Sequence, residues 1–207
     1  MNPAVSETSS SDALIALHFQ NDICHPRGAI PFSLHRGTTA AKRFFEASRR
    51  ALERARGAGW TIAHAHIVFA ADYSDLSRNC RLFAKTQELA ALKQGSWGAA
   101  AYEGFEPHDG EIVVASNANS AFRRTNLENL LRDRAVTRIN VMGLATQFSV
   151  DHTVRDAADM GYPVRLFADC CISGDLKAHG ASLRTLAMLA DVVDSALCFK
   201  TKIRSGN

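Results

Sequence analysis

The sequence predicts a three-layer α/β fold, in which six mostly parallel strands form one sheet with helices on both faces. Short apolar runs alternate along the chain with longer stretches whose apolar residues recur at helical spacing. This order indicates a parallel sheet, because parallel strands need a crossover connection that a helix usually supplies. Hydrophobic residues make up 46% of the chain and charged residues 22%, as in ordinary folded domains.

The first expected strand covers residues 13–18, an apolar run that is typical of a strand covered on both faces. A helix is expected over 38–56, where small and apolar residues fall on one face until Gly57 and Gly59 end it. The pair Thr125 and Glu128 predicts a capping box at the start of another helix. The remaining expected elements are strands over 60–69, 111–115, 137–142, 162–168 and 191–193, and helices over 125–134, 146–160 and 176–190.

The chain is expected to hold a single domain over residues 13–207, preceded by a disordered tail over residues 1–12. The tail is polar and rich in serine, and it lacks the apolar segment of a signal peptide. The loop-rich stretch over 70–110 interrupts the strand and helix order. Loops of this length in a compact domain usually build a binding site.

The charge pattern argues against nucleic acid and membrane partners. The net charge of +3 comes from scattered residues, 24 basic and 21 acidic, without interleaved aromatic side chains. No apolar run approaches the length of a membrane span. The five cysteines are odd in number and form no C-x-x-C pair, which favours a reducing cytoplasm over a disulfide framework or a zinc ribbon.

No cofactor is expected either. The chain lacks the glycine-rich phosphate loops of nucleotide-binding folds and the G-x-S-x-G turn of α/β-hydrolases. In open parallel sheets, ligands bind beyond the carboxyl ends of the strands. The candidate segments for a small-molecule site are therefore 18–22, 116–122 and 143–149.

Four segments of the sequence resemble the isochorismatase-like hydrolases, a superfamily also called cysteine hydrolases. They are LIALHFQNDICHPRG (14–28), GSWGAAAYEGFEP (95–107), IVVASNANSAFRRTNLENLL (112–131) and INVMGLATQFSVDHTVRDAADMGYPVRLFADCC (139–171). The resemblance covers about residues 13–198. It implies the predicted sheet, a small-molecule ligand, a homodimer or larger assembly, and a non-proline cis peptide in the turn that starts at Gly143.

The resemblance also implies three catalytic positions, which amidase members fill with Asp, Lys and Cys. This chain has His18, Ser116 and Ser149 there. A Ser hydroxyl is much less acidic than a thiol, so it needs a hydrogen-bonded general base. We expect His18 to be that base for Ser149, with Ser116 or Asn119 as a hydrogen-bond donor. The residues expected to contact the ligand are Gln20, Trp97, Asn119, Phe122, Ala145 and Phe148.

Three functions remain open on this basis. The leading one is hydrolysis of a small amide, ureido or related substrate through the altered site. The alternative is a ligand-binding or regulatory relative without turnover, in which Ser149 is merely a small residue. A third is vinyl-ether hydrolysis of the isochorismatase type, for which His18 would have to act as a general acid.

His64 and His66 are two apart on an expected strand, so they project from the same face. Some members of the resembling superfamily bind a metal near the site through an Asp and histidines. In this sequence the pair has no clear carboxylate partner. We therefore expect no metal, with His64 and His66 lining a pocket or bonding to the backbone.

Overall fold

The computed structural model describes residues 11–199, and its six strands form one parallel sheet in the order β3-β2-β1-β4-β5-β6. The predicted fold class is therefore confirmed. The strands are β1 (Asp12–Leu17), β2 (Thr61–Ile67), β3 (Ile112–Ser116), β4 (Arg138–Leu144), β5 (Val164–Ile172) and β6 (Asp191–Val193).

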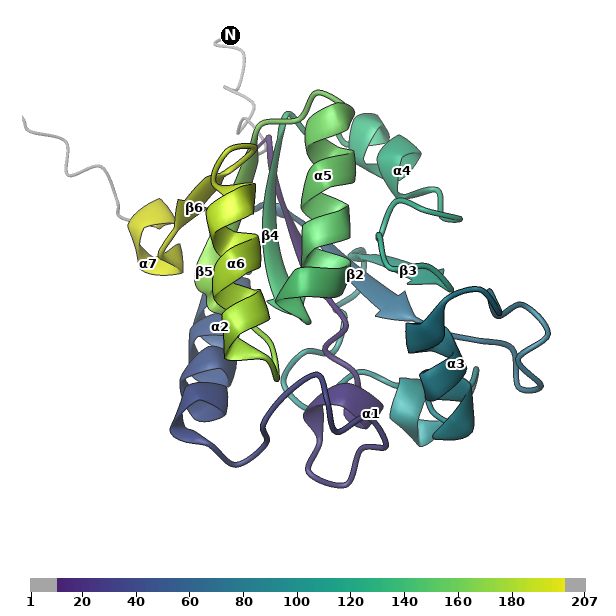
Figure 1. Cartoon of the computed structure of the whole chain (residues 1–207). Helices are drawn as coiled ribbons and strands as arrows, with labels where there is room; N and C mark the ends of the chain where they lie inside the picture. Colours follow the sequence, from purple (N-terminus) through teal and green to yellow (C-terminus); the bar gives the residue numbers. More distant parts are fainter. Residues whose placement is uncertain (1–10, 200–207) are drawn as a thin grey trace, which may run out of the picture.

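Helices cover both faces of the sheet (Figure 1). One face packs against α2, and the other packs against α4, α5 and α6. Figure 1 also shows α1 and α3 below the sheet, at the end toward which the strands point. The helices are α1 (Asn21–Cys24), α2 (Thr39–Gly57), α3 (Arg81–Glu88), α4 (Leu127–Asp133), α5 (Asp151–Asp159), α6 (Leu176–Leu186) and α7 (Ser195–Cys198), with short turns η1 (Trp97–Ala99) and η2 (Thr146–Val150).

The central strand β1 separates the two cores. Leu14 and Ala16 pack into the core on the α2 side, while Ile15 and Leu17 pack into the core on the α5 side. The strand pairs with β2 on one side and β4 on the other, so it has no free edge. Burial on both faces explains why its sequence is continuously apolar.

Several expected boundaries are corrected by the structure. Asp12 already belongs to β1, and the carbonyl of Ser11 accepts hydrogen bonds from the backbone N–H groups of Thr137 and Arg138. Residues 11 and 12 therefore belong to the fold and not to the expected tail. The first ten residues of that tail lie outside the described part of the chain, and so do residues 200–207 of the expected domain. Strand β5 continues to Ile172, and its pairing with β4 shifts register between Val141 and Gly143.

The predicted capping box is wrong. Asn126 is the N-cap residue of α4, while the Thr125 hydroxyl donates to the carbonyl of Ala121 and accepts from the backbone N–H of Leu127. The Glu128 carboxylate pairs with Arg132 one turn later and does not return to the helix start. Within residues 11–199, no helix is both long and apolar enough to cross a lipid bilayer.

Candidate functional site

A small pocket lies at the carboxyl ends of β1 and β4. His18, which follows β1, and Ser149 in η2 both line it, together with Asn119, Ala145 and Phe148. The volume that the centre of a water molecule can occupy in it is about 40 Å³. One water molecule needs roughly 10–15 Å³ on this measure. The pocket therefore has room for about three waters, or for a group the size of a carboxamide.

His18 presents a neutral imidazole to this pocket. The residue is 2% exposed, and its backbone has a positive φ of 60°. Its backbone N–H donates to the carbonyl of Ala65 at 2.9 Å, which holds the chain beside β2. Burial, and then the nearby His66, lower the pKa of His18 to about 3. At pH 7 the ring therefore carries one donor nitrogen and one acceptor nitrogen.

Ser149 lines the same pocket and is 5% exposed. It belongs to η2, which follows the cis peptide between Leu144 and Ala145 that the resemblance implies. Neither ring nitrogen of His18 has a hydrogen-bond partner among the described residues, so the expected direct bond between His18 and Ser149 is not formed.

The carboxylate of Asp22 does not orient the His18 ring. Its two oxygens accept from the backbone N–H groups of Ala29 at 3.2 Å and Leu92 at 2.7 Å. Asp22 therefore ties the loop after α1 to the segment after α3. A general base at His18 would have to work without an acidic partner from this residue.

Two residues that line the pocket, His18 and Asn119, have buried hydrogen-bonding atoms without a partner among the residues that the structure describes. The Oδ1 atom of Asn119 is buried and, like the two ring nitrogens of His18, has no partner within the described chain. A buried polar atom without a partner typically costs about 1–3 kcal/mol. None of the side chains lining the pocket is a carboxylate, an ammonium or a guanidinium. The arrangement suits an uncharged ligand group that both donates and accepts hydrogen bonds.

Apolar side chains form most of the remaining wall. Phe32, Leu82 and Phe83 come from loops and from α3, and the sequence interpretation did not place them in the site. They carry no signal that separates a pocket wall from a core, because apolar residues in loops serve both purposes. Only the three-dimensional arrangement brings them to His18.

Two of the expected polar site residues lie elsewhere. The Ser116 hydroxyl donates to the carbonyl of Arg123 at 2.8 Å and accepts from the backbone N–H of Ala118 at 3.0 Å. Ser116 lines a different and larger cavity at the ends of β2 and β3. Gln20 is fully buried, and its amide group bonds to the backbone of Ile67 and Ala99. Both side chains stabilise loops and are not turned toward the pocket of His18.

Two of the expected aromatic residues also lie outside this pocket. Phe122 packs into the core between the sheet and α5. Trp97 is 49% exposed, and its ring lies 5.0 Å from that of His25 and 5.5 Å from the guanidinium of Arg27. The structure thus brings together His18, Asn119, Ala145, Phe148 and Ser149 from the predicted set.

The interpretation that His64 lacks a carboxylate partner is wrong. Its Nε2 atom lies 2.9 Å from Oε2 of Glu111, and the same carboxylate pairs with Arg56 at 2.7 Å. No group of three or more His, Cys, Asp or Glu side chains in residues 11–199 could hold a metal. The centroids of the His64 and His66 rings are 6.5 Å apart. His64, Glu111 and Arg56 form a partly buried hydrogen-bonded network, and the ring of His66 lies beside that of His64.

Comparisons with known proteins agree with this architecture. The chain is 26% identical over 174 residues to the ureidoacrylate amidohydrolase of Azorhizobium caulinodans, covering 78% of this chain and 74% of that protein. It is 33% identical over 97 residues to the nicotinamidase of Escherichia coli, covering 39% of this chain and 46% of that protein.

Solved structures show the same fold. A cysteine hydrolase from Pseudomonas syringae pv. phaseolicola superposes with a TM-score of 0.82 at 22% identity, over 92% of this chain and 91% of that one. An isochorismatase family protein from Desulfovibrio vulgaris gives a TM-score of 0.79 at 25% identity, over 91% and 96% of the two chains. The isochorismatase domain family matches residues 12–196, and the chain therefore belongs to the isochorismatase family.

Proposed function

We propose that this chain binds the carboxamide or ureido group of a small molecule in the pocket formed by His18, Asn119 and Ser149. The observation that carries the proposal is that His18 and Asn119, which line a small pocket without charged side chains, have buried hydrogen-bonding atoms without a partner in residues 11–199. A neutral imidazole offers one donor and one acceptor, and the Asn119 carbonyl offers another acceptor. A primary amide has the complementary pair, an acceptor oxygen and an N–H₂ donor.

The size and charge of the pocket support an amide over other groups. A space of about 40 Å³ holds a few heavy atoms, so only the head of a ligand fits without movement of Phe148 or Phe83. A carboxylate or an ammonium would lose its hydration without meeting an opposite charge. Two of the relatives, the ureidoacrylate amidohydrolase and the nicotinamidase, are named for acting on ureido or amide compounds.

Hydrolysis of the bound amide through Ser149 is the second candidate function. Membership of the family supports it, because amidase members attack such groups from the position to which the sequence resemblance assigns Ser149. In that reaction the Ser149 hydroxyl would attack the amide carbon while neutral His18 takes the hydroxyl proton. His18 would pass this proton to the amide nitrogen as the C–N bond breaks, so that ammonia or an amine leaves and Ser149 carries the acyl group as an ester. Water would then cleave the ester, which releases the acid and restores the Ser149 hydroxyl.

Three features favour ligand binding without turnover over hydrolysis. The pKa of His18, lowered to about 3 by burial, makes the ring a weak base at neutral pH. No direct hydrogen bond joins His18 to Ser149, and no carboxylate orients the ring within the described residues. The same low pKa argues against vinyl-ether hydrolysis, because a general acid must hold a proton at the working pH.

A titration followed by ¹H–¹⁵N NMR tests the binding proposal. Acetamide and acetate have nearly the same shape and differ in charge, so they separate a neutral amide site from an anion site. We expect acetamide to shift the backbone resonances of Ala145 and Ser149, and acetate to leave them in place. Asn119→Ala should weaken the acetamide effect, and Asn79→Ala, at an exposed asparagine, is the matched control. Absence of any acetamide shift at Ala145 and Ser149 refutes the proposal.

Ammonia release from acetamide and from N-carbamoyl compounds tests the second candidate. Turnover that Ser149→Ala and His18→Asn both abolish would establish hydrolysis through this pair. Acetamide binding without ammonia release would leave binding as the function. Turnover that survives both substitutions would show that the pair is not the reacting centre.

We further propose that the chain works in the cytoplasm as a homodimer or larger assembly. The resemblance to the family supports an assembly, and the five free cysteines are consistent with a reducing compartment. On the edge strand β3, Val113 is 50% exposed, which leaves an apolar side chain available to a second copy. Light scattering of the purified chain tests the assembly, and a monomer at micromolar concentration would contradict it.

A further inference from the structure

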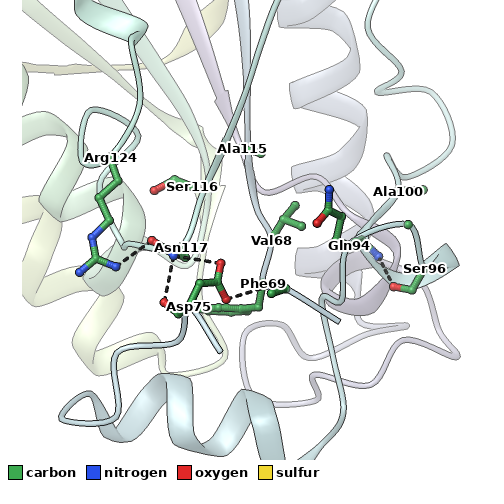
Figure 2. A pocket seen from close by; sticks show the side chains of 13 residues that line it. Val68, Phe69, Asp75, Gln94, Ser96, Ala100, Ala115, Ser116, Asn117 and Arg124 are labelled. Atoms are coloured by element: carbon green, nitrogen blue, oxygen red, sulfur yellow. Dashed lines mark hydrogen bonds between the residues drawn. The ribbon is translucent and has the colours of Figure 1, made fainter. Parts of the chain in front are cut away.

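A second and much larger cavity lies between the loops that follow β2 and β3 (Figure 2). Its volume is about 590 Å³, which is within the range of small-molecule sites. Gln20 marks the boundary between the two cavities. Its Nε2 atom donates to the carbonyl of Ile67, whose side chain lines the pocket of His18, and to that of Ala99, which lines the larger cavity.

A cation and an anion stand close together on one side of this cavity. Nη1 of Arg124 donates to Oδ1 of Asn117 at 2.9 Å, and Nδ2 of Asn117 donates to Oδ2 of Asp75 at 3.0 Å. Figure 2 shows the side chains of Arg124, Asn117 and Asp75 side by side in this order. The guanidinium and the carboxylate are thus separated by a single carboxamide group.

Arg124 has no acidic partner within the part of the chain that the structure describes. Besides Asn117, the one group among residues 11–199 that its guanidinium bonds to is the hydroxyl of Ser77, at 3.3 Å. The residue also has a positive φ of 60°, a conformation that side-chain-bearing residues rarely adopt and that concentrates at functional sites. The backbone and neutral neighbours therefore hold the guanidinium at the cavity. Some of its N–H groups remain available to donate hydrogen bonds to a ligand.

The opposite side of the cavity is polar but uncharged (Figure 2). The carboxamide of Gln94 has no hydrogen-bond partner among residues 11–199, although its backbone N–H bonds to Phe69. The Ser96 hydroxyl accepts from the backbone N–H of Ala99 at 3.3 Å, so its own proton remains available. Val68 lies between the two sides and offers an apolar surface.

We propose that this cavity binds a small zwitterion of the α-amino acid type with a polar side chain. Arg124 binds the carboxylate, Asp75 binds the ammonium, and Gln94 bonds to the polar end of the side chain. The head of an amino acid carries its two opposite charges a few bonds apart, as the short spacing of Arg124 and Asp75 requires. A guanidinium is well suited to a carboxylate because it donates two parallel hydrogen bonds.

L-Glutamine is the probe that tests this site, with two analogues that each lack one charge. Glutaramate lacks the ammonium, and 4-aminobutanamide lacks the carboxylate. We expect L-glutamine to bind most tightly, and to shift the side-chain N–H₂ resonances of Gln94 and Asn117 in ¹H–¹⁵N spectra. Gln94→Ala identifies the first of these resonances by its loss.

Two substitutions separate the roles of the charges. Arg124→Gln should weaken L-glutamine and glutaramate about tenfold, because it removes a charge-assisted hydrogen bond, while 4-aminobutanamide changes little. Asp75→Asn should weaken L-glutamine and 4-aminobutanamide and spare glutaramate. Arg134→Gln, at an exposed arginine that bonds to the carbonyl of Leu130, is the matched control.

L-Glutamine also carries a carboxamide, the group proposed to bind in the pocket of His18, so its affinity for the larger cavity is read from the Gln94 and Asn117 resonances alone. Equal L-glutamine affinities in the native chain and in Arg124→Gln would overturn the proposal. So would saturation that leaves the Gln94 and Asn117 resonances in place. The acetamide titration reports the smaller pocket separately, so either site can fail without the other.

Discussion

Gln20 and Ile67 exchange two hydrogen bonds. The backbone N–H of Ile67 donates to Oε1 of Gln20 at 2.9 Å, and Nε2 of Gln20 donates to the carbonyl of Ile67 at 3.0 Å. The same nitrogen donates to the carbonyl of Ala99 at 2.9 Å. One fully buried side chain thus satisfies three backbone groups at the end of β2 and in η1. A residue that appeared suited to ligand binding instead holds the loops around the site.

Gln20→Leu should destabilise the fold by about 2–4 kcal/mol, because it leaves three buried backbone groups without partners. The free energy of unfolding from urea titrations measures this. Gln87→Leu is the matched control, since Gln87 lies on the exposed surface of α3 and should change stability by less than about 0.5 kcal/mol. Equal stabilities of the two variants would show that the Gln20 network contributes nothing.

A second prediction concerns Gly98, which packs against the carboxylate of Asp22. A Cβ atom at Gly98 would lie 2.0 Å from Oδ2 of Asp22, and that carboxylate already holds Leu92 and Ala29. Gly98→Ala should therefore destabilise the fold by about 1–3 kcal/mol, in the range of other overpacked sites.

Gly180→Ala is the control for that substitution. Gly180 lies inside α6, where a Cβ would meet only the end of Arg184 at 3.5 Å. Alanine should stabilise this helix by about 0.5–1 kcal/mol. Thermal unfolding of both variants gives shifts of opposite sign if the argument is right. A melting temperature of Gly98→Ala at or above that of the native chain would contradict it.

The regular part of the fold could be predicted from the sequence because it depends on local patterns. The residues of β1 are apolar on both faces, and those of α2 repeat at helical spacing, so both elements were predicted within one or two residues. The prediction of a capping box from Thr125 and Glu128 failed because two suitable residue types at the right spacing are not sufficient to form one. In the structure the Thr125 hydroxyl reaches the carbonyl of Ala121, and Arg132 pairs with Glu128.

The site was predicted less completely because its residues come from distant loops. The position of His18 follows from the end of a strand, and that of Ser149 from the resemblance to the family. In contrast, Gln20 follows the same strand, but its contacts lie 47 and 79 residues away at Ile67 and Ala99. Contacts at such separation leave no periodic signal in one sequence. The hydrogen bond that joins Asp75 to Asn117, and through it to Arg124, also connects residues far apart in the chain, so the sequence did not reveal it either.

A third prediction concerns Glu111, whose carboxylate accepts hydrogen bonds from Arg56, His64 and the backbone of His108. These hydrogen bonds outweigh the opposing effect of burial and lower its pKa to about 2. Glu111→Gln removes the charge that faces Arg56 and should destabilise the fold by about 2–3 kcal/mol at pH 7.

Glu88→Gln is the matched control for Glu111→Gln. Glu88 pairs with Lys85, but the two side chains are 65% and 55% exposed, so this pair should contribute less than about 0.5 kcal/mol. Urea titrations of the two variants side by side measure the difference. If Glu111→Gln lowers the free energy of unfolding no more than Glu88→Gln does, the partial burial of Glu111 adds nothing to the strength of its contacts with Arg56 and His64.

The last prediction concerns the pH dependence that His18 gives to folding. The pKa of its buried ring is about 3, against an ordinary value of 6.5, so the folded chain binds fewer protons than the unfolded chain between these values. Stability is therefore fully present above pH 6.5 and falls as the pH drops toward 3. The slope is about 1.4 kcal/mol per pH unit, or about 2 kcal/mol between pH 7 and pH 5.

His18→Asn removes this titrating group and suits the positive φ of the position, because asparagine tolerates that conformation better than most residues. The loss of unfolding free energy between pH 7 and pH 5 should shrink by about 2 kcal/mol in this variant. Part of what remains comes from His66, whose pKa is lowered to about 4, mainly by burial, and part from His64 and His179, whose pKa values burial also lowers. His35→Asn, at an exposed histidine, is the control. An unchanged pH dependence in His18→Asn would mean that the ring becomes protonated in the folded chain, and the uncharged pocket proposed for amide binding would then carry a positive charge.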